Sequence, residues 1–345
     1  MKKRDRSKLV GESPNPGLYS VRPLEMGGLR TYPLSTRPAK VHVRDFAKPV
    51  APGSRFSKFF DSLPAILGAE DLRHIRDALI RARREKRTII WGIGGHVIKV
   101  GLGPILIDLM NRGYVSAIAM NGAALVHDFE IALSGGTSED VEEGLGKGKF
   151  GMAEETGRYL NEAAAHAHQQ GIGLGEATGQ LLGEPYLKPE YPEASVLVQA
   201  YRARVPVTIH LAIGTDIPHM HQTASGEALG AATHHDFRLF CALVKEMEPG
   251  GVYLNWGSAV ILPEVFLKAV TVARNLGARL EPITTANFDF IQHYRPSQNV
   301  VKRPTAKTRG TKTSSRGFSI TGHHEIMMPL LAAAVIDNDR RRSRA

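Results

Sequence analysis

The sequence has only one cysteine, Cys241, among its 345 residues. A single thiol cannot form an intrachain disulfide, and it cannot build a metal site from several thiolates. No run approaches the roughly 18 consecutive apolar residues that a membrane-spanning helix needs. The basic N-terminal residues are followed by proline and glycine rather than by the apolar segment of a secretory signal. These absences predict a cytoplasmic protein with no membrane partner.

Charge is distributed unevenly along the chain. Residues 1–60 contain 13 Lys or Arg against four Asp or Glu, and residues 301–345 contain ten against three, whereas the middle of the chain is acidic. A basic segment can bind nucleic acid by neutralising phosphates. Here, however, no aromatic residues are interleaved with the basic ones and no nucleic-acid motif occurs. We therefore expect no nucleic-acid partner, and the ends are more typical of arms that dock on the acidic body of the same or a neighbouring subunit.

The pattern of apolar residues divides the chain into three parts. Residues 1–54 are rich in proline, glycine and arginine and lack a sustained period, which predicts an extended basic arm. Residues 55–337 alternate short β-rich runs with helical runs, and residues 338–345 form a basic tail. The expected strands are 88–91, 115–120, 205–213, 252–256 and 280–285. The expected helices are 56–84, 102–112, 123–133, 152–169, 235–248, 263–276 and 324–336. This alternation predicts a doubly wound, Rossmann-like α/β fold, with a mainly parallel sheet and helices on both faces.

A glycine turn follows the first expected strand. Gly94, Gly95 and His96 come directly after it, and Gly101 precedes the next helix. Strand, glycine turn and helix are what a phosphate-binding corner needs, because glycines let the anion approach the backbone N–H groups at the helix start. The spacing is not G-x-G-x-x-G. The alternative is a tight turn that only connects a strand to a helix.

A second corner follows the second expected strand. Asn121, Gly122 and Ala123 form it, without the acidic residue that holds a ribose in a standard dinucleotide site. His127 and Asp128 lie one turn into the following helix and would sit beside a cofactor bound at the first corner. The alternative is that these two residues form a hydrogen-bonded pair without a catalytic role.

Ordered segments of the chain resemble the deoxyhypusine synthase family. Residues 94–102 and 118–128 resemble the two NAD-contacting loops of that family, and matches at 205–216, 283–289, 295–296 and 328–331 follow in the same order. The resemblance implies a doubly wound, tetrameric enzyme that uses NAD. It also implies cofactor contacts from Thr285, Ala286 and Asp289.

The family transfers part of spermidine through an imine on a lysine, and this resemblance makes Lys302 the best counterpart of that lysine. The spacing is two residues shorter here, and the neighbouring Trp and Gly are missing. Family acids that hold spermidine align with His221 and Gln298, and the family's Lys-His-His stretch is replaced within residues 255–262. A polycation site needs carboxylates, so we expect a smaller amine or amino acid as substrate rather than spermidine.

Several histidines cluster in sequence in a region where the family has none. His219 and His221 follow Asp216, and His234 and His235 come shortly after. Neutral imidazoles with a carboxylate can hold zinc or iron. The alternative, a polar pocket or a subunit interface, is the commoner use of such residues, and we expect no metal.

The leading hypothesis is therefore an NAD-dependent transferase or oxidoreductase that acts on a small amine or amino acid. Lys302, His127, Asp216 and His221 are its candidate catalytic residues. A non-catalytic NAD-binding scaffold and a metal-assisted lyase or hydrolase are the alternatives. The basic segment 302–316 is predicted to be either a functional loop or a solvated connector.

Overall fold

The structure is a computed structural model that describes residues 21, 23–306 and 315–342. The chain divides into two compact units, residues 1–44 and 45–345. In the first unit the described residues contain isolated 3-10 turns, η1 (Met26–Gly28) and η2 (Leu34–Thr36), neither of which has a buried residue. A third turn, η3 (Val43–Asp45), spans the boundary. The second unit carries the fold.

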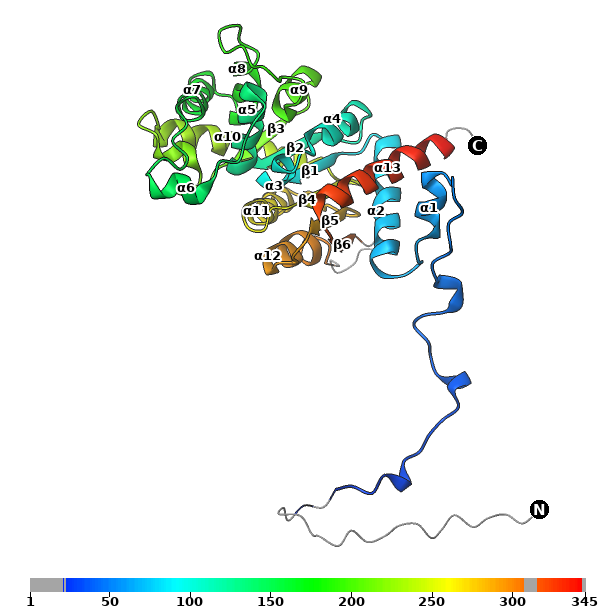
Figure 1. The fold of residues 1–345 in the computed structure, drawn as a ribbon. Coiled ribbons are helices and arrows are strands. Elements are labelled where there is room, and N and C mark those ends of the chain that lie inside the picture. The colour runs from blue at the N-terminus through cyan, green and yellow to red at the C-terminus, as the bar shows by residue number, and fades with distance from the viewer. Residues whose placement is uncertain (1–20, 22, 307–314, 343–345) are drawn as a thin grey trace, which may run out of the picture. The chain divides into compact units, whose positions relative to one another are not determined.

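Six strands in the described residues form one sheet in which every neighbouring pair is parallel (Figure 1). They are β1 (Ile89–Ile93), β2 (Ala117–Asn121), β3 (Val207–His210), β4 (Val252–Trp256), β5 (Thr284–Asp289) and β6 (Arg316–Thr321). Their order, β3-β2-β1-β4-β5-β6, is that of a doubly wound Rossmann sheet. The predicted α/β class is confirmed.

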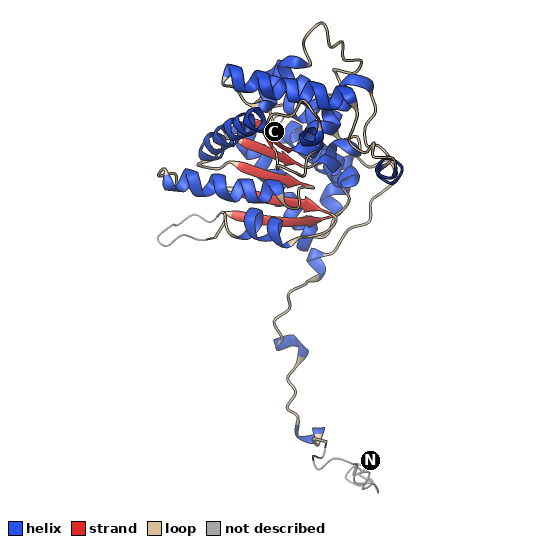
Figure 2. Ribbon diagram, turned by 90° about the vertical axis from the view of Figure 1, so that its left-hand side faces the viewer, coloured by secondary structure: helices blue, strands red, loops and turns tan. Residues whose placement is uncertain are grey.

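Helices lie on both faces of this sheet (Figure 2). They are α1 (Phe56–Ser62), α2 (Leu67–Arg84), α3 (Gly95–Lys99), α4 (Gly103–Asn111), α5 (Gly122–Ser134), α6 (Val141–Gly146), α7 (Glu154–Gln170), α8 (Leu174–Leu181), α9 (Val196–Ala203), α10 (Gly226–Lys245), α11 (Ile261–Asn275), α12 (Tyr294–Pro296) and α13 (His324–Arg342). A 3-10 turn, η4 (Ile217–Met220), and a π-helical turn, η5 (Ser297–Lys302), complete the described elements. No helix among the described residues is long and apolar enough to cross a membrane.

The strands alternate their side chains between two hydrophobic cores. Trp91 of β1 packs on one face, in the core that contains residues of α2 and α13, and Ile90 packs on the other, with residues of α10 and α11. On the first face the ring of Trp256 stacks at 5.8 Å on Trp91 and at 3.9 Å on Phe288. Because both faces are covered, the central strands are apolar at nearly every position. This explains why their sequences could be recognised as strands.

Several elements differ from the sequence prediction: the helix expected over 56–84 is divided into α1 and α2, and helices α3, α6, α8 and α9 were not expected. Strand β6 was not expected, because its residues alternate between buried and exposed and, among the described strands, it pairs with β5 alone. Helix α10 begins at Gly226, where Ser225 caps it by accepting the N–H of Ala228, rather than at residue 235. Helix α13 continues past residue 336 to Arg342 and contains Pro329. Most of the predicted loop 302–316 lies outside the described residues.

Candidate functional site

The carboxyl ends of β1 and β4 meet at the point where the strand order reverses, which is where doubly wound folds bind ligands. Gly94 follows β1, and its N–H donates to the carbonyl of Trp256 at 2.8 Å. A Cβ at Gly94 would overlap the carbonyl oxygen of Gly257, the residue after β4. Gly257 itself has φ of 65°, a left-handed conformation that favours glycine. Glycine is therefore required on both sides of the switch point.

Gly95 brings helix α3 close to helix α5. A Cβ at this position would lie 2.9 Å from the Cβ of Ala123 and 3.1 Å from Cδ2 of His127. The side chain of His127 therefore reaches the glycine turn from the first turns of α5. The predicted pair of corners, one after β1 and one after β2, is brought together at this point.

A hydrogen-bonded chain orients His127. Its Nδ1 lies 2.7 Å from Oγ1 of Thr137, and that hydroxyl donates to Oε2 of Glu130 at 2.5 Å. The other carboxylate oxygen of Glu130 accepts the hydroxyl of Thr156 at 3.1 Å. A threonine hydroxyl has one proton, and here Glu130 receives it. Thr137 must therefore accept from Nδ1–H of His127, which leaves Nε2 of His127 as an unprotonated nitrogen.

The surroundings of His127 keep its ring neutral. Burial lowers its pKa below the ordinary 6.5, and the positive charge of Lys99 lowers it further. A neutral imidazole whose Nδ1 proton is held by a hydroxyl–carboxylate pair has the arrangement of a general base. Sequence reasoning singled out His127 but missed Glu130 and Thr137.

Asp216 lies at the end of β2 although it follows β3 in the sequence. A Cβ at Gly122 would overlap its carboxylate, so the two residues are in direct contact. One carboxylate oxygen accepts the N–H of Ala212 at 2.8 Å. Burial raises the pKa of Asp216, and the hydrogen bond from Ala212 opposes that rise. An acidic side chain from the loop after β3 thus lies beside the end of β2, where the sequence itself has none.

The other side of the switch point carries a cluster of rings, of which the sequence analysis singled out His96 but not His324. His324, at the start of α13, lies with its ring centroid 5.3 Å from that of His96 and 5.8 Å from that of Phe290. Its Nε2 lies 3.2 Å from the carbonyl of Phe288, which makes Nε2 the protonated nitrogen. Its Nδ1 is buried and has no partner among the described residues. This nitrogen lies beside Gly257, where a Cβ would be 3.3 Å away.

Asp289 ends β5 next to this ring cluster. Its Oδ1 accepts the N–H of Phe290 at 2.9 Å and lies 3.9 Å from Nε2 of His324. Asp289 was predicted to contact the cofactor and lies at the edge where a cofactor would bind. Asn121, another predicted contact, caps α5 by accepting the N–H of Ala124.

Four other predicted site residues lie elsewhere. Asp128 is buried and accepts hydrogen bonds from Ser195 and from the N–H groups of Val196 and Leu197, so it caps helix α9. Burial raises the pKa of Asp128 to about 6, and these hydrogen bonds oppose the rise. Thr285 and Ala286 are fully buried in the first half of β5. Gly101 is exposed, with φ of 79°, between α3 and α4.

Lys302 is not brought together with the other candidate catalytic residues. It is exposed at the end of η5. The preceding Val300 accepts a hydrogen bond from Thr285, the second residue of β5, and the carbonyl of Val301 packs on Gly317, the second residue of β6. These contacts are at the amino-terminal halves of the strands, whereas His127 and Asp216 lie at the carboxyl ends.

The histidines after β3 contact different parts of the chain. Nε2 of His221 lies 2.8 Å from the carbonyl of Gly151, whereas Nδ1 of His219 accepts the N–H of Gly214 at 3.3 Å. His234 is exposed on α10 and stacks on Phe237, and His235 is half-buried beside it. In the part of the chain that the structure describes, no three His, Cys, Asp or Glu side chains could hold a metal ion together.

No model of a known protein family and no curated protein sequence matches the chain. Several solved structures are similar. A protein provisionally described as a deoxyhypusine synthase from Entamoeba histolytica is 13% identical, with a TM-score of 0.49, over 83% of this chain and 94% of its own. ArgZ, an arginine dihydrolase of the cyanobacterial ornithine–ammonia cycle, is 14% identical, with a TM-score of 0.46, over 79% of this chain and 32% of its own. AgrE, solved with ornithine and NAD+, is 16% identical, with a TM-score of 0.47, over 79% of this chain and 33% of its own. The chain therefore spans about a third of the length of ArgZ and AgrE.

Proposed function

We propose that this chain is an NAD-dependent enzyme that oxidises a small amine or amino acid. The observation that carries the proposal is the neutral, oriented His127 beside the glycine turn at the switch point of the sheet. Dinucleotides bind at this point in doubly wound folds. A general base in the same place suits a reaction in which a proton and a hydride leave the substrate together.

The residues at this edge fit a dinucleotide in two respects. Asp216 lies beside the end of β2, where an acidic residue holds the ribose hydroxyls of NAD in related folds. The buried Nδ1 of His324 is an acceptor without a described partner, and such a group is stabilised when a ligand donates a hydrogen bond to it.

The proposed chemistry divides between the cofactor and the chain. Bound NAD would supply the hydride acceptor. Nε2 of His127 takes one proton from the nitrogen of a neutral amine, while the hydrogen on the adjacent carbon leaves as hydride. The carbon–nitrogen single bond becomes a double bond, so the amine becomes an imine. Glu130, acting through Thr137, stabilises the imidazolium that forms on His127.

A small substrate is proposed because each of the two carboxylates considered at this edge accepts a backbone N–H, and the remaining acceptor positions of Asp216 are assigned to the ribose. Asp216 accepts the N–H of Ala212, and Asp289 accepts the N–H of Phe290. A polyamine would need several free carboxylates spaced along its length. A substrate with one amine group next to one reacting carbon does not need several carboxylates.

Two measurements test the proposal. Calorimetric titration of the purified protein with NAD+ should show binding, and Asp216→Asn should weaken it by about tenfold, the value of one hydrogen bond to a charged group. Formation of NADH with a panel of small amines and amino acids should then identify a substrate. His127→Gln should lose at least a hundredfold in kcat, the lower range for a general base.

The matched control is His168→Gln, because His168 is an exposed histidine on α7, away from the glycine turn. Its activity should equal that of the wild type. Absence of NAD+ binding at millimolar cofactor would end the proposal. NAD+ binding without turnover of any amine, in wild type and His127→Gln alike, would instead favour the non-catalytic scaffold.

A further inference from the structure

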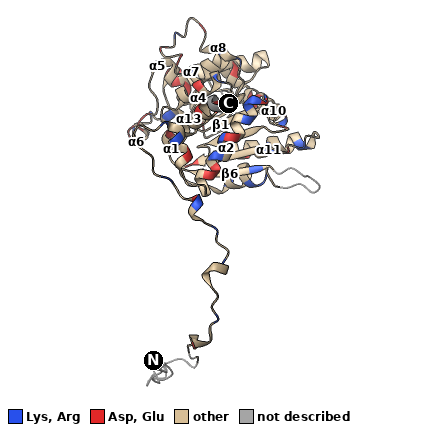
Figure 3. Ribbon diagram, turned by 90° about the vertical axis from the view of Figure 1, so that its right-hand side faces the viewer, with Lys and Arg blue, Asp and Glu red and all other residues tan. Residues whose placement is uncertain are grey.

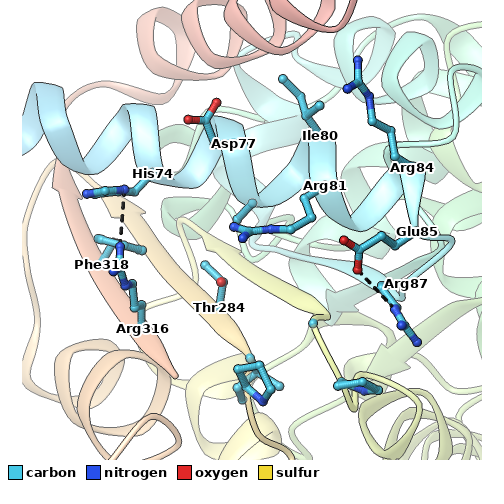
Figure 4. Close-up of a pocket in the computed structure, with 15 residues that line it drawn as sticks. His74, Asp77, Ile80, Arg81, Arg84, Glu85, Arg87, Thr284, Arg316 and Phe318 are labelled. Carbon is cyan, nitrogen blue, oxygen red and sulfur yellow. Dashed lines mark hydrogen bonds and ion pairs between the residues drawn. The ribbon is translucent and has the colours of Figure 1, made fainter. Parts of the chain in front are cut away.

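A pocket of about 810 Å³ lies at the amino-terminal ends of the strands, whereas the candidate site lies at their carboxyl ends. It is lined by the second half of α2, the turn before β1, and the starts of β5 and β6 (Figure 4). Pro249, Gly250 and Pro282, which precede β4 and β5, complete its wall. Small-molecule sites commonly have volumes of about 300 to 1,000 Å³. The pocket therefore has the size of a site for a small molecule.

Positive charge predominates in this pocket. Helix α2 carries both basic and acidic residues (Figure 3), but the pocket lining contains two acidic side chains, Asp77 and Glu85, against four guanidinium groups. The guanidinium groups belong to Arg81, Arg84, Arg87 and Arg316. The lining therefore has an excess of two positive charges.

Two of the four arginines have carboxylate partners. Arg84 pairs with Asp339 of α13 at 2.7 Å. Arg87 lies 3.6 Å from Glu85, beyond hydrogen-bond distance, and its buried Nε has no hydrogen-bond partner among the described residues. A buried guanidinium nitrogen without an acceptor is costly, so Arg87 is incompletely satisfied by the described chain.

The other two arginines have no carboxylate partner among the described residues. Figure 4 shows Arg81 projecting from α2 over the starts of the strands. Arg316 donates from Nη1 to Nδ1 of His74 at 3.4 Å. Nε2 of His74 lies 3.5 Å from Glu70, so the ring of His74 links that carboxylate to Arg316 and holds the guanidinium at the pocket wall.

The polarity of helix α2 accounts for part of this charge but not for all of it. Basic residues in a last turn interact favourably with the negative end of the helix dipole, and this explains Arg81 and Arg84. Arg87 and Arg316 belong to other segments, the lead into β1 and the first residue of β6. They line opposite sides of the pocket (Figure 4), so its positive charge does not come from the end of one helix alone.

We propose that this pocket binds a small molecule through a phosphate or diphosphate group, at a site separate from the one at the carboxyl edge. Guanidinium groups match the oxygen spacing of phosphates and form paired, charge-assisted hydrogen bonds with them. A phosphate placed between Arg81 and Arg316 can accept hydrogen bonds from both guanidinium groups, which have no carboxylate partner among the described residues. The remaining volume accommodates the organic part of the ligand.

Calorimetric titration with inorganic pyrophosphate tests the proposal. We expect saturable binding to the full-length protein, weakened about tenfold or more in Arg81→Gln and in Arg316→Gln, because each change removes a charge-assisted contact. Arg238→Gln is the matched control, since Arg238 is an exposed arginine on α10 that does not line the pocket. Its affinity should equal that of the wild type, and the melting temperatures of all three variants should stay within a few degrees of it.

The other outcomes are distinct. Equal weakening in Arg238→Gln would show attraction to net charge alone and would overturn the proposal, as would the absence of saturable binding. Citrate binding as tightly as pyrophosphate, with the same dependence on Arg81, would replace phosphate by carboxylate as the ligand group. Displacement of pyrophosphate by NAD+ would show that the pocket is not a separate site. Failure of NAD+ to bind at all would leave the pyrophosphate result standing, so this proposal and the proposed function are tested separately.

Discussion

Thr137→Val should allow the neutral ring of His127 to populate both tautomers instead of the Nδ1–H form alone. The hydroxyl of Thr137 lies between Nδ1 of His127, at 2.7 Å, and Oε2 of Glu130, at 2.5 Å. Valine keeps the shape of threonine but can neither accept from the ring nor donate to the carboxylate. The lost hydrogen bond contributes about 1 to 1.5 kcal/mol to the Nδ1–H form, which corresponds to about a tenfold population ratio.

Nitrogen chemical shifts of histidine-labelled protein measure this population without any substrate. The wild type should show His127 as a neutral ring protonated at Nδ1 at neutral pH, because its pKa is lowered by burial and by Lys99. The signal of His127 can be assigned among those of the 14 histidines because it is missing from the spectrum of His127→Gln. Thr137→Val should give a mixture with the Nε2–H form.

Thr156→Val provides the control for this prediction. It removes the other hydroxyl donor of Glu130, at 3.1 Å, without touching His127. The tautomer should therefore stay at Nδ1–H. A wild-type ring protonated at Nε2, or an unchanged ring in Thr137→Val, would refute the hydrogen-bond order that makes His127 a base.

Three further predictions concern residues away from this chain of hydrogen bonds. Asp128→Ala should lower the free energy of unfolding by about 3 kcal/mol or more in urea denaturation, because it leaves buried donors at the start of α9 without an acceptor; an effect below 1 kcal/mol would contradict this role. Burial lowers the pKa of His210 to about 3, so the stability that its neutral ring contributes is present above pH 6.5 and is lost as pH falls towards 3. The difference in unfolding free energy between wild type and His210→Gln should then shrink by up to about 1.4 kcal/mol per pH unit in that range, and a constant difference would count against it. Lys302→Ala should retain amine oxidation, because Lys302 follows residues that contact the starts of β5 and β6; loss of turnover would support the lysine imine that the family resemblance implies.

The fold could be predicted where burial forces a simple pattern. Strands β1, β2 and β4 are buried on both faces, so they appear in the sequence as short apolar runs between helical ones. Strand β6 has alternating buried and exposed residues, pairs with β5 alone among the described strands, and follows a segment without an apolar period. A pattern of this kind does not distinguish an edge strand from a loop.

The candidate site was accessible from sequence only through its local parts. His127 could be singled out because it follows a glycine corner, and Glu130 lies three residues later on the same helix, a spacing that could have revealed it. Thr137 could not be found in this way, since it reaches His127 only after the chain reverses at Gly135, whose φ is 76°. The contact between Asp216 and Gly122 depends on the alignment of β2 with β3, which no local pattern encodes.

The arginine pocket was inaccessible for a related reason. Its basic side chains come from α2, the lead into β1 and the first residue of β6, and these segments meet only when the sheet forms. In the sequence each of these arginines is one charged residue among many.

The tetramer that the family resemblance implies stays a prediction.

Helix α13 has a practical consequence for anyone who wishes to shorten this protein. Residues 338–345, the last eight of the chain, have the composition of a dispensable charged tail, yet Asp339 within them accepts hydrogen bonds from Arg83, Arg84 and Tyr114. The first residue of α13 is His324, at the other edge of the sheet. Trimming the C-terminus at residue 337 would remove the anchor of a helix about 28 Å long. A truncated protein that lost NAD+ binding would therefore reveal nothing about the tail as a partner-binding arm, and an Asp339→Asn variant should be prepared first.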